Sequence, residues 1–228
     1  MSEVHPIEVE SYRILRSRID LSALPPLSRA VTERIIHATA DFDYVTDLMC
    51  DEAALAAGVE ALRRGAPVIA DVAMVSSGIT GYPVICKIGD SLCARLARTA
   101  NLTLSAAAVR LAFGEAGPGA VWLVGCAPTA LNEIMSRQVE PALVIGVPVG
   151  FVGAAAAKDD LRASGLPALT NVSEKGGSAV AVAAFNALLR IATAEAGAEA
   201  SSEAGAGGRA GAGAGGRAGT GESPEAAR

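Results

Sequence analysis

Two basic side chains three positions apart, Arg34 and His37, are the residues best suited to chemistry in this chain. Side chains at this spacing project from one helix face, and the apolar residues around them predict a helix over 26–38. The other histidine, His5, stands beside Pro6 in a segment without a clear pattern. His37 falls in the last helical turn, where the helix dipole favours a charged imidazole, so we expect His37 to act as a general acid.

Arg34 lies within the apolar stripe of the same predicted helix. A guanidinium on a desolvated surface needs an anionic partner, so Arg34 is expected to meet an acidic group of a ligand. A structural role for His37 is also consistent with helix geometry. In that alternative its imidazole bonds to a carbonyl group or to Glu33, four residues earlier.

Three glycine turns form a second group of candidate binding residues. Backbone N–H groups at a helix start have no partner within the helix, so such a turn can bind an anion. Three turns together favour a ligand with several negative groups, although each alone is equally consistent with close packing of helix on sheet. The turns, each between an apolar run and a predicted helix, are 121–131 with Gly125 and Thr129, 146–158 with Gly150 and Gly153, and 171–179 with Gly176, Gly177 and Ser178.

Several common catalytic and binding motifs are missing from the sequence. There is no nucleophile elbow, no HExxH and no Walker A run. Gly146, Gly150 and Gly153 have the spacing GxxxGxxG, which differs from the dinucleotide pattern GxGxxG. The four cysteines show no CxxC pair, so reduced thiols and no metal site are expected.

Helical and strand-like patterns alternate along most of the chain. Predicted helices cover 8–19, 26–38, 51–64, 91–100, 105–116, 130–137, 155–163 and 178–194, and predicted buried strands cover 67–75, 84–88, 120–125, 142–148 and 168–172. This alternation predicts an α/β three-layer sandwich with a mainly parallel sheet and extra N-terminal helices. Ligands of such sheets bind at the carboxyl ends of the strands, which is where all three glycine turns are expected.

Composition separates one domain of 1–194 from a tail. Residues 195–228 are rich in Ala and Gly and are predicted to be disordered. The net charge of −5 argues against a nucleic-acid partner, and the sequence contains no apolar run long enough for a membrane span. The N-terminus lacks the pattern of a signal peptide, so we expect a cytoplasmic protein.

Six segments in a fixed order carry a resemblance to a known family. They are His5–Glu8, Glu33–Ala38, Met74–Val75 with Gly78–Thr80, Ala127–Leu131, Pro148–Ala154 with Lys158, and Gly176–Ala179. Over roughly residues 5–192 the chain resembles the precorrin-8X methylmutase family, which includes the cobalt-precorrin-8 methylmutases. The resemblance implies a flavodoxin-like fold, a homodimer, and an isomerase of corrin ring biosynthesis that moves a methyl group from C11 to C12 of a tetrapyrrole-derived macrocycle.

The resemblance also implies roles for individual residues. His37 would protonate the macrocycle and promote a 1,5-sigmatropic shift. Substrate contacts would come from Ser11, Arg34, Thr129, Gly150, Gly176, Gly177 and Ser178. No cofactor is implied, because cobalt enters only as part of the substrate. Ile35, Met74, Val75 and Phe151 are expected to provide apolar walls for the ring.

The sequence departs from the family pattern at five positions. Ala73, Leu104, Ala156, Ala157 and Val172 stand where family members commonly carry polar or charged residues. An alternative function is therefore a non-catalytic corrinoid-binding protein with a degenerate pocket. A nucleotide- or phosphate-binding domain that uses the same helix starts is a third interpretation, ranked last because the sequence lacks a P-loop lysine.

Overall fold

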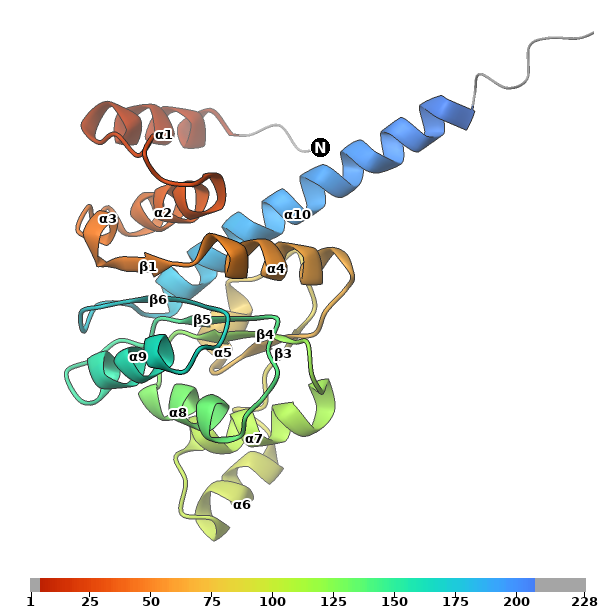
Figure 1. Ribbon diagram of the computed structural model, residues 1–228. Helices are drawn as coiled ribbons and strands as arrows, with labels where there is room; N and C mark the ends of the chain where they lie inside the picture. The colour runs from red at the N-terminus through yellow and green to blue at the C-terminus, as the bar shows by residue number, and fades with distance from the viewer. Residues whose placement is uncertain (1–4, 208–228) are drawn as a thin grey trace, which may run out of the picture. The chain divides into compact units, whose positions relative to one another are not determined.

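The computed structural model describes residues 5–207 (Figure 1), and the larger of its two compact units ends at Thr193. This unit begins with helices, as the sequence predicts. The predicted helices are α1 (Pro6–Arg18), α2 (Pro26–Thr39) and α4 (Glu52–Arg63), and the short α3 (Tyr44–Asp47) was not predicted. Proline at the first positions of α1 and α2 suits a helix start, because the missing N–H has no partner there in any case.

A six-stranded sheet follows, with the order β1-β6-β5-β4-β2-β3. Its strands are β1 (Leu48–Cys50), β2 (Val68–Ala70), β3 (Val84–Ile85), β4 (Val121–Val124), β5 (Leu143–Gly146) and β6 (Ala168–Asn171). All neighbours pair in parallel except β1, which is antiparallel to β6. Numbered by themselves along the chain, the five parallel strands have the order 2-1-3-4-5, which is the flavodoxin-like order. The predicted fold class is confirmed.

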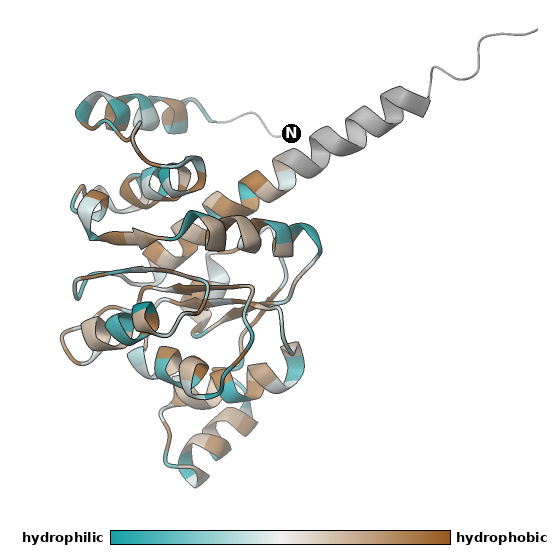
Figure 2. Ribbon diagram, viewed as in Figure 1, coloured by the Kyte–Doolittle hydropathy of each residue, from teal (hydrophilic) through white to brown (hydrophobic). Residues whose placement is uncertain are grey.

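Alternate strand residues contribute to two separate cores, which gives the larger unit three layers. Val121 and Leu123 of β4 belong to the core under α2, α4 and α10 (Ser178–Gly207). Trp122 and Val124 belong to the opposite core. The strands lie between these helical layers and are among the most hydrophobic parts of the ribbon (Figures 1 and 2). Burial on both faces explains why the strands read as continuous apolar runs.

The opposite layer consists of α7 (Leu104–Ala116), α8 (Pro128–Ser136) and α9 (Ala154–Ala163), and α6 (Ser91–Thr99) packs on α7. These helices start within two residues of their predicted positions. Thr103 caps α7 by accepting a hydrogen bond from the N–H of Ala106 at 3.2 Å, and Asp90 caps α6 in the same way through Leu92 at 2.8 Å.

Two predictions from the apolar pattern need correction. The run 67–75 is not one strand, because β2 ends at Ala70. The last residues of the run belong to the short helix α5 (Ala73–Ser77). The segment Leu48–Cys50 was not predicted as a strand, yet it forms the edge strand β1. Three residues show no periodicity, and here the strand depends on pairing with β6, which lies far along the chain.

Helix α10 reaches Gly207, beyond residue 194, where the sequence predicts a disordered tail. Residues 208–228 of that tail lie outside the described residues.

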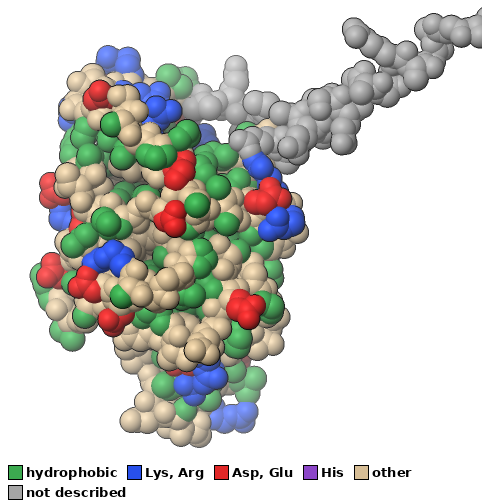
Figure 3. All heavy atoms as spheres, viewed as in Figure 1, with side chains coloured by type: hydrophobic (Ala, Val, Ile, Leu, Met, Phe, Trp, Pro, Cys, Tyr) green, Lys and Arg blue, Asp and Glu red, His purple; other side chains and the backbone are tan. Residues whose placement is uncertain are grey.

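On the face shown in Figure 3, acidic and basic side chains are intermixed. No helix within residues 5–207 is both long enough and apolar enough to cross a membrane.

Candidate active site

His37 lies in the last turn of α2, and both ends of this helix are fixed. At the start, the Glu52 carboxylate of α4 accepts hydrogen bonds from the N–H groups of Leu27 and Ser28 at 2.8 and 2.9 Å. At the end, Ala40 adopts a left-handed conformation with φ of 54° and terminates the helix. The placement of α2, and with it the placement of the His37 imidazole, therefore depends on α4 as well as on local sequence.

Two consecutive residues of α1 contact the imidazole of His37. Ser11 Oγ lies 2.7 Å from Nδ1 of His37. The ring of Tyr12 stacks on the imidazole, with 4.9 Å between ring centroids and 11° between ring planes. Among residues 5–194, whose side chains the structure describes, Nε2 of His37 has no hydrogen-bond partner. This nitrogen is thus the one that can exchange a proton with a ligand.

Arg34 has an internal anionic partner. Its Nη1 donates to Glu8 Oε1 at 2.7 Å and to the hydroxyl of Tyr12 at 3.4 Å. The same Glu8 oxygen accepts from Nη1 of Arg190 at 2.7 Å. Burial by itself would raise the pKa of Glu8, but the bonds from Arg190 and Arg34 outweigh it, so the pKa lies below its usual value. The anion that Arg34 was expected to need is present in the protein itself.

Glu33 is committed to Arg16 of α1. Its carboxylate accepts from Nε and Nη2 of Arg16 at 2.9 and 2.7 Å, which is a bidentate pair. The alternative in which Glu33 pairs with His37 is therefore wrong. Arg16 also lies over the Tyr12 ring, with 5.6 Å from its guanidinium carbon to the ring centroid. A cavity of about 310 Å³ borders these charged groups, lined in part by Tyr12, Arg34 and Arg190.

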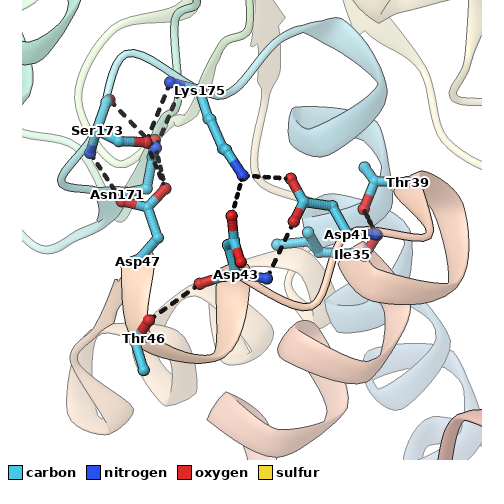
Figure 4. Close-up of polar contacts among 9 residues, drawn as sticks. All are labelled: Ile35, Thr39, Asp41, Asp43, Thr46, Asp47, Asn171, Ser173 and Lys175. Carbon is cyan, nitrogen blue, oxygen red and sulfur yellow. Dashed lines mark hydrogen bonds and ion pairs between the residues drawn. The ribbon is translucent and has the colours of Figure 1, made fainter.

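The segment that follows His37 is clamped to the segment that precedes Gly176 (Figure 4). Nζ of Lys175 donates to Asp41 at 2.8 Å and to Asp43 at 2.5 Å. The bond from Lys175 holds the pKa of the Asp41 carboxyl below its usual value. Residues far apart in the chain are brought side by side in this way.

A buried lysine holds the loop before α10 from beneath. Lys158 of α9 is 0% exposed, and its Nζ donates to Asn171 Oδ1 at 3.0 Å, to the carbonyl of Lys175 at 2.7 Å and to the carbonyl of Ser173. Burial lowers the pKa of Lys158 to about 8. Because three acceptors surround the amine, this lysine supports the loop and is not directed at a ligand.

Asp47 holds the same loop from the side (Figure 4). Its carboxylate accepts from the side-chain amide of Asn171 at 2.8 Å and from the N–H groups of Val172 and Ser173 at 3.1 and 2.7 Å. Burial alone would raise the pKa of Asp47, but these hydrogen bonds outweigh it and the pKa is lowered. The carboxylate contacts the loop that precedes α10, and among the described residues none of its hydrogen bonds goes to the first turn of that helix.

The glycine loops after β5 and β6 are bonded to each other. Gly177 donates its N–H to the carbonyl of Val147 at 2.8 Å, and Gly150 donates to the carbonyl of Glu174 at 3.1 Å. At Gly176, φ is 142° and an added Cβ would lie 2.3 Å from the oxygen of Val147. The N–H groups of Gly150 and Gly177, which the sequence offered to an anion, are therefore used between the loops.

The turn before α8 is closed by a side chain of the protein. The Asp71 carboxylate accepts from the N–H groups of Gly125, Cys126 and Ala127 at 3.2, 2.9 and 3.1 Å. Burial raises the pKa of Asp71, although these hydrogen bonds act in the opposite direction. The prediction of an open anion site at Gly125 is wrong, because Asp71 already occupies it.

The starts of α9 and α10 differ from that of α8. Gly153, with φ of 79°, caps α9 without a side-chain hydrogen bond. Ser178 opens α10, and a Cβ added at Gly125 would lie 2.8 Å from its Cα. Thr129 is exposed and its hydroxyl lies 2.7 Å from that of Thr103. Among the described residues, no hydrogen bond or ring contact joins Thr129 to His37, Arg34 or the loops before α9 and α10.

The expected apolar walls divide into two pairs. Ile35 and Val75 are both 0% exposed within the core, so the prediction that they line a ligand site is wrong. Met74 and Phe151 are 73% and 97% exposed. Only the second pair offers apolar surface to a ligand or to another chain, and both residues follow strands at the carboxyl edge of the sheet.

The five departures from the family pattern occupy unlike environments. Ala157 is 2% exposed, so a larger side chain there would have to displace its packing. Ala73 and Ala156 are exposed, and Leu104 and Val172 are 49% and 47% exposed. Within residues 5–194, whose side chains the structure describes, no group of three or more His, Cys, Asp and Glu side chains is placed to hold a metal ion.

Sequence reasoning missed four residues that shape the site: Glu8, Tyr12, Asp71 and Arg190. The partners of Tyr12 lie 22 and 25 positions along the chain, at Arg34 and His37, so no local pattern reveals them. Asp71 does have a signal, because a carboxylate that directly follows a buried strand needs hydrogen-bond donors. The turn before α8, which follows the neighbouring strand β4, supplies them.

These features define a class of protein: a flavodoxin-like α/β enzyme with added N-terminal helices. Those helices hold an imidazole with one free nitrogen, and a clamp joins them to glycine loops at the carboxyl edge of the sheet. The model of the CbiC (precorrin-8X methylmutase) family matches residues 6–191.

Similar proteins agree with that match. The cobalt-precorrin-8 methylmutase of Salmonella typhimurium is 39% identical over 195 residues, covering 80% of this chain and 93% of that protein. The precorrin-8X methylmutase of Pseudomonas aeruginosa is 37% identical over 191 residues, covering 78% and 91%. The crystal structure of precorrin-8X methyl mutase from Thermus thermophilus has a TM-score of 0.75 at 34% identity, covering 84% of this chain and 99% of that chain. This chain belongs to the precorrin-8X methylmutase family and is a methylmutase, an isomerase of cobalamin biosynthesis.

Proposed function

We propose that this protein moves a methyl group from C11 to C12 of precorrin-8X or cobalt-precorrin-8, giving hydrogenobyrinic or cobyrinic acid. His37 is the general acid of this reaction. The observation that carries the proposal is the placement of its imidazole, which has Ser11 at Nδ1 and no described partner at Nε2. An imidazolium bonded through Nδ1–H to Ser11 donates its Nε2 proton and keeps that bond as the neutral tautomer.

The reaction balances without a second substrate. Protonation of the macrocycle by His37 promotes the 1,5-sigmatropic shift, in which the bond from the methyl group to C11 breaks as the bond to C12 forms. The product is an isomer of the substrate, so the proton taken up before the shift is returned afterwards to His37 or to solvent. The proposal therefore includes no resident cofactor, and any cobalt belongs to the substrate.

The carboxylates of the substrate suit the starts of α9 and α10. The residues proposed to contact the substrate are Ser11, Arg34, Thr129, Gly150, Gly176, Gly177 and Ser178. Gly150 and Gly177 do so without their N–H groups, which bond between the loops. Support comes from the start of α9, which has no side-chain cap, and from the helix dipoles, which attract negative groups. Met74 and Phe151 offer exposed apolar surface to the ring.

A homodimer and a cytoplasmic location are also part of this proposal. Phe151 and Val152 are 97% and 90% exposed beside Gly150. Large apolar side chains with so much exposed surface are typical of regions that another surface covers. Light scattering of the purified protein at two concentrations measures whether the dimer forms, and Phe151→Ser is expected to weaken it.

The test of the catalytic role is His37→Ala, followed by the absorption change from precorrin-8X to product. We expect kcat to fall at least about 100-fold, because a positioned general acid contributes about 10²–10⁴ to a rate. Binding of the product, measured by its absorption on the protein, is expected to persist. Equal conversion by wild type and His37→Ala would remove His37 from the mechanism.

The chain supplies a matched control at its other histidine. His5 Nδ1 accepts a hydrogen bond from the N–H of Ile7 and caps α1. His5→Asn keeps a capping side chain and is expected to leave kcat unchanged. Product binding without conversion by the wild-type protein would instead support the non-catalytic corrinoid-binding alternative.

A further inference from the structure

Tyr12 contacts more of the charged groups near His37 than any other aromatic residue among those described. Its ring stacks on the imidazole of His37 at 4.9 Å, its hydroxyl lies 3.4 Å from Nη1 of Arg34, and the guanidinium carbon of Arg16 lies 5.6 Å from its ring centroid. One side chain of α1 thus touches both basic residues of α2 that the sequence marked for chemistry.

The hydrogen bond between Ser11 Oγ and Nδ1 does not by itself fix the imidazole. A single contact at Nδ1 restrains one atom of the ring and allows the ring plane to tilt about that contact. Such a tilt moves Nε2, which is the nitrogen that donates the proton. The stack with Tyr12, at 11° between ring planes, restrains the tilt that Ser11 leaves free. Two neighbouring residues of α1 therefore supply complementary restraints.

Tyr12 is not the only residue that joins α1 to α2. Glu8 accepts hydrogen bonds from Arg34 and Arg190 at 2.7 Å each. One turn beyond Tyr12, Arg16 forms its bidentate pair with Glu33. These ion pairs join α1 to α2 and α10 on both sides of Tyr12. Loss of the aromatic ring is expected to leave the helices in place and to free the imidazole.

We propose that Tyr12 is a positioning residue for the reaction, which sets the plane of the His37 imidazole and so the direction of Nε2. This inference rests on the proposed role of His37 as the general acid. The aromatic ring is the required part of the side chain, and the hydroxyl is secondary because its distance of 3.4 Å to Arg34 makes it a weak hydrogen bond.

The experiment compares Tyr12→Leu with Tyr12→Phe in the full-length protein. The leucine variant removes the ring, and the phenylalanine variant keeps it. For Tyr12→Leu we expect kcat to fall about 10–100-fold with KM within about threefold of wild type, because small displacements of a catalytic group reduce the rate by this order. Tyr12→Phe is expected to retain kcat within about threefold. Thermal melting of both variants reports whether the fold is intact.

Proton NMR of the imidazole gives a readout that does not depend on turnover. The chain has two histidines, so His37→Ala assigns their ring C–H resonances. Stacking on Tyr12 shifts the His37 resonances upfield. We expect this shift to be lost in Tyr12→Leu and kept in Tyr12→Phe, while the His5 resonances stay in place in both.

The possible results separate this inference from the function on which it rests. Wild-type activity together with full kcat in Tyr12→Leu would overturn the positioning role and leave the function standing. A wild-type protein without activity would refute the function, and the NMR spectra would then decide the positioning: unchanged His37 resonances in Tyr12→Leu would overturn it as well. A fall in kcat of Tyr12→Phe equal to that of Tyr12→Leu would transfer the role from the ring to the hydroxyl.

Discussion

The starts of α8 and α10 look alike in sequence and differ in what they offer a ligand. Each follows a parallel strand through a turn with glycine, and each turn is held by a carboxylate. At α8, Asp71 accepts directly from the N–H groups of Gly125, Cys126 and Ala127. At α10, Asp47 accepts from Val172 and Ser173, which precede the helix. Asp71 thus occupies the position that an anion would take at the start of α8. Asp47 instead holds the loop that leads into α10.

This difference shows that a glycine turn at a sheet edge predicts the backbone path but not whether the site is open. The N–H groups at a helix start must be satisfied by something, and an internal carboxylate competes with a ligand for them. The closed start at α8 is a structural feature, and the start of α10 is the stronger candidate for substrate carboxylates.

The largest expected effect on stability comes from Gly176→Ala, which changes the loop before α10. The added Cβ would lie 2.3 Å from the oxygen of Val147, and φ of 142° is unfavourable for alanine. We expect the free energy of unfolding to fall by about 3–5 kcal/mol, measured by urea unfolding. Gly165→Ala is the control, because φ of 74° strains the residue but no atom lies within 4 Å, and about 1 kcal/mol is expected. Equal losses for the two variants would show that the close approach to Val147 is unimportant.

The next effect is expected from Asp71→Ala, which opens the start of α8. Three N–H groups lose their acceptor, and we expect a loss of about 2–3 kcal/mol in the free energy of unfolding. Added formate should then raise the melting temperature of this variant more than that of wild type, because the anion can occupy the vacated position. No difference in the response to formate would mean that the two helix starts do not differ as described.

The smallest effect is expected from Asp47→Asn, and it depends on pH. The folded pKa of Asp47 is lowered, so its contribution to stability is complete above the unfolded value of about 4 and is lost as pH falls through the folded pKa. At pH 7 we expect the variant to be about 1 kcal/mol less stable, since solvent partly screens this carboxylate. The gap between wild type and variant should narrow on acidification, as measured by urea unfolding from pH 7 to pH 3. A gap that widens in acid would contradict the lowered pKa.

Much of the fold was predictable because its signals are local. The strands β4 and β5 are buried on both faces, which requires apolar residues at every position. Helix starts are marked by capping residues such as Thr103 before α7. Strand β1 was not predictable, because Leu48–Cys50 pairs with β6 and has no pattern of its own. The helix α5 was not predicted either, because Ala73–Val75 continue the apolar run of β2 and so have the pattern of a strand.

The candidate site was predictable in its residue types and less so in its contacts. His37 and Arg34 were marked by their places on an amphipathic helix, and Ser11 by family resemblance. The stack with Tyr12 and the bond from Arg34 to Glu8 join residues more than twenty positions apart. Contacts at that separation depend on how two helices pack, which no short window of sequence contains.

The sequence by itself determined the parallel α/β sheet, the added N-terminal helices and the histidine at the end of the second of them. These follow from periodicity and from chain-order rules that hold for any such pattern. Tertiary structure decided which charges are already neutralised: Glu8 on Arg34, Glu33 on Arg16, and Asp71 on the start of α8. Whether a charged or polar group is available to a ligand depends on its neighbours in space. Buried charges and buried N–H groups are stable only when they have an ion-pair or hydrogen-bond partner.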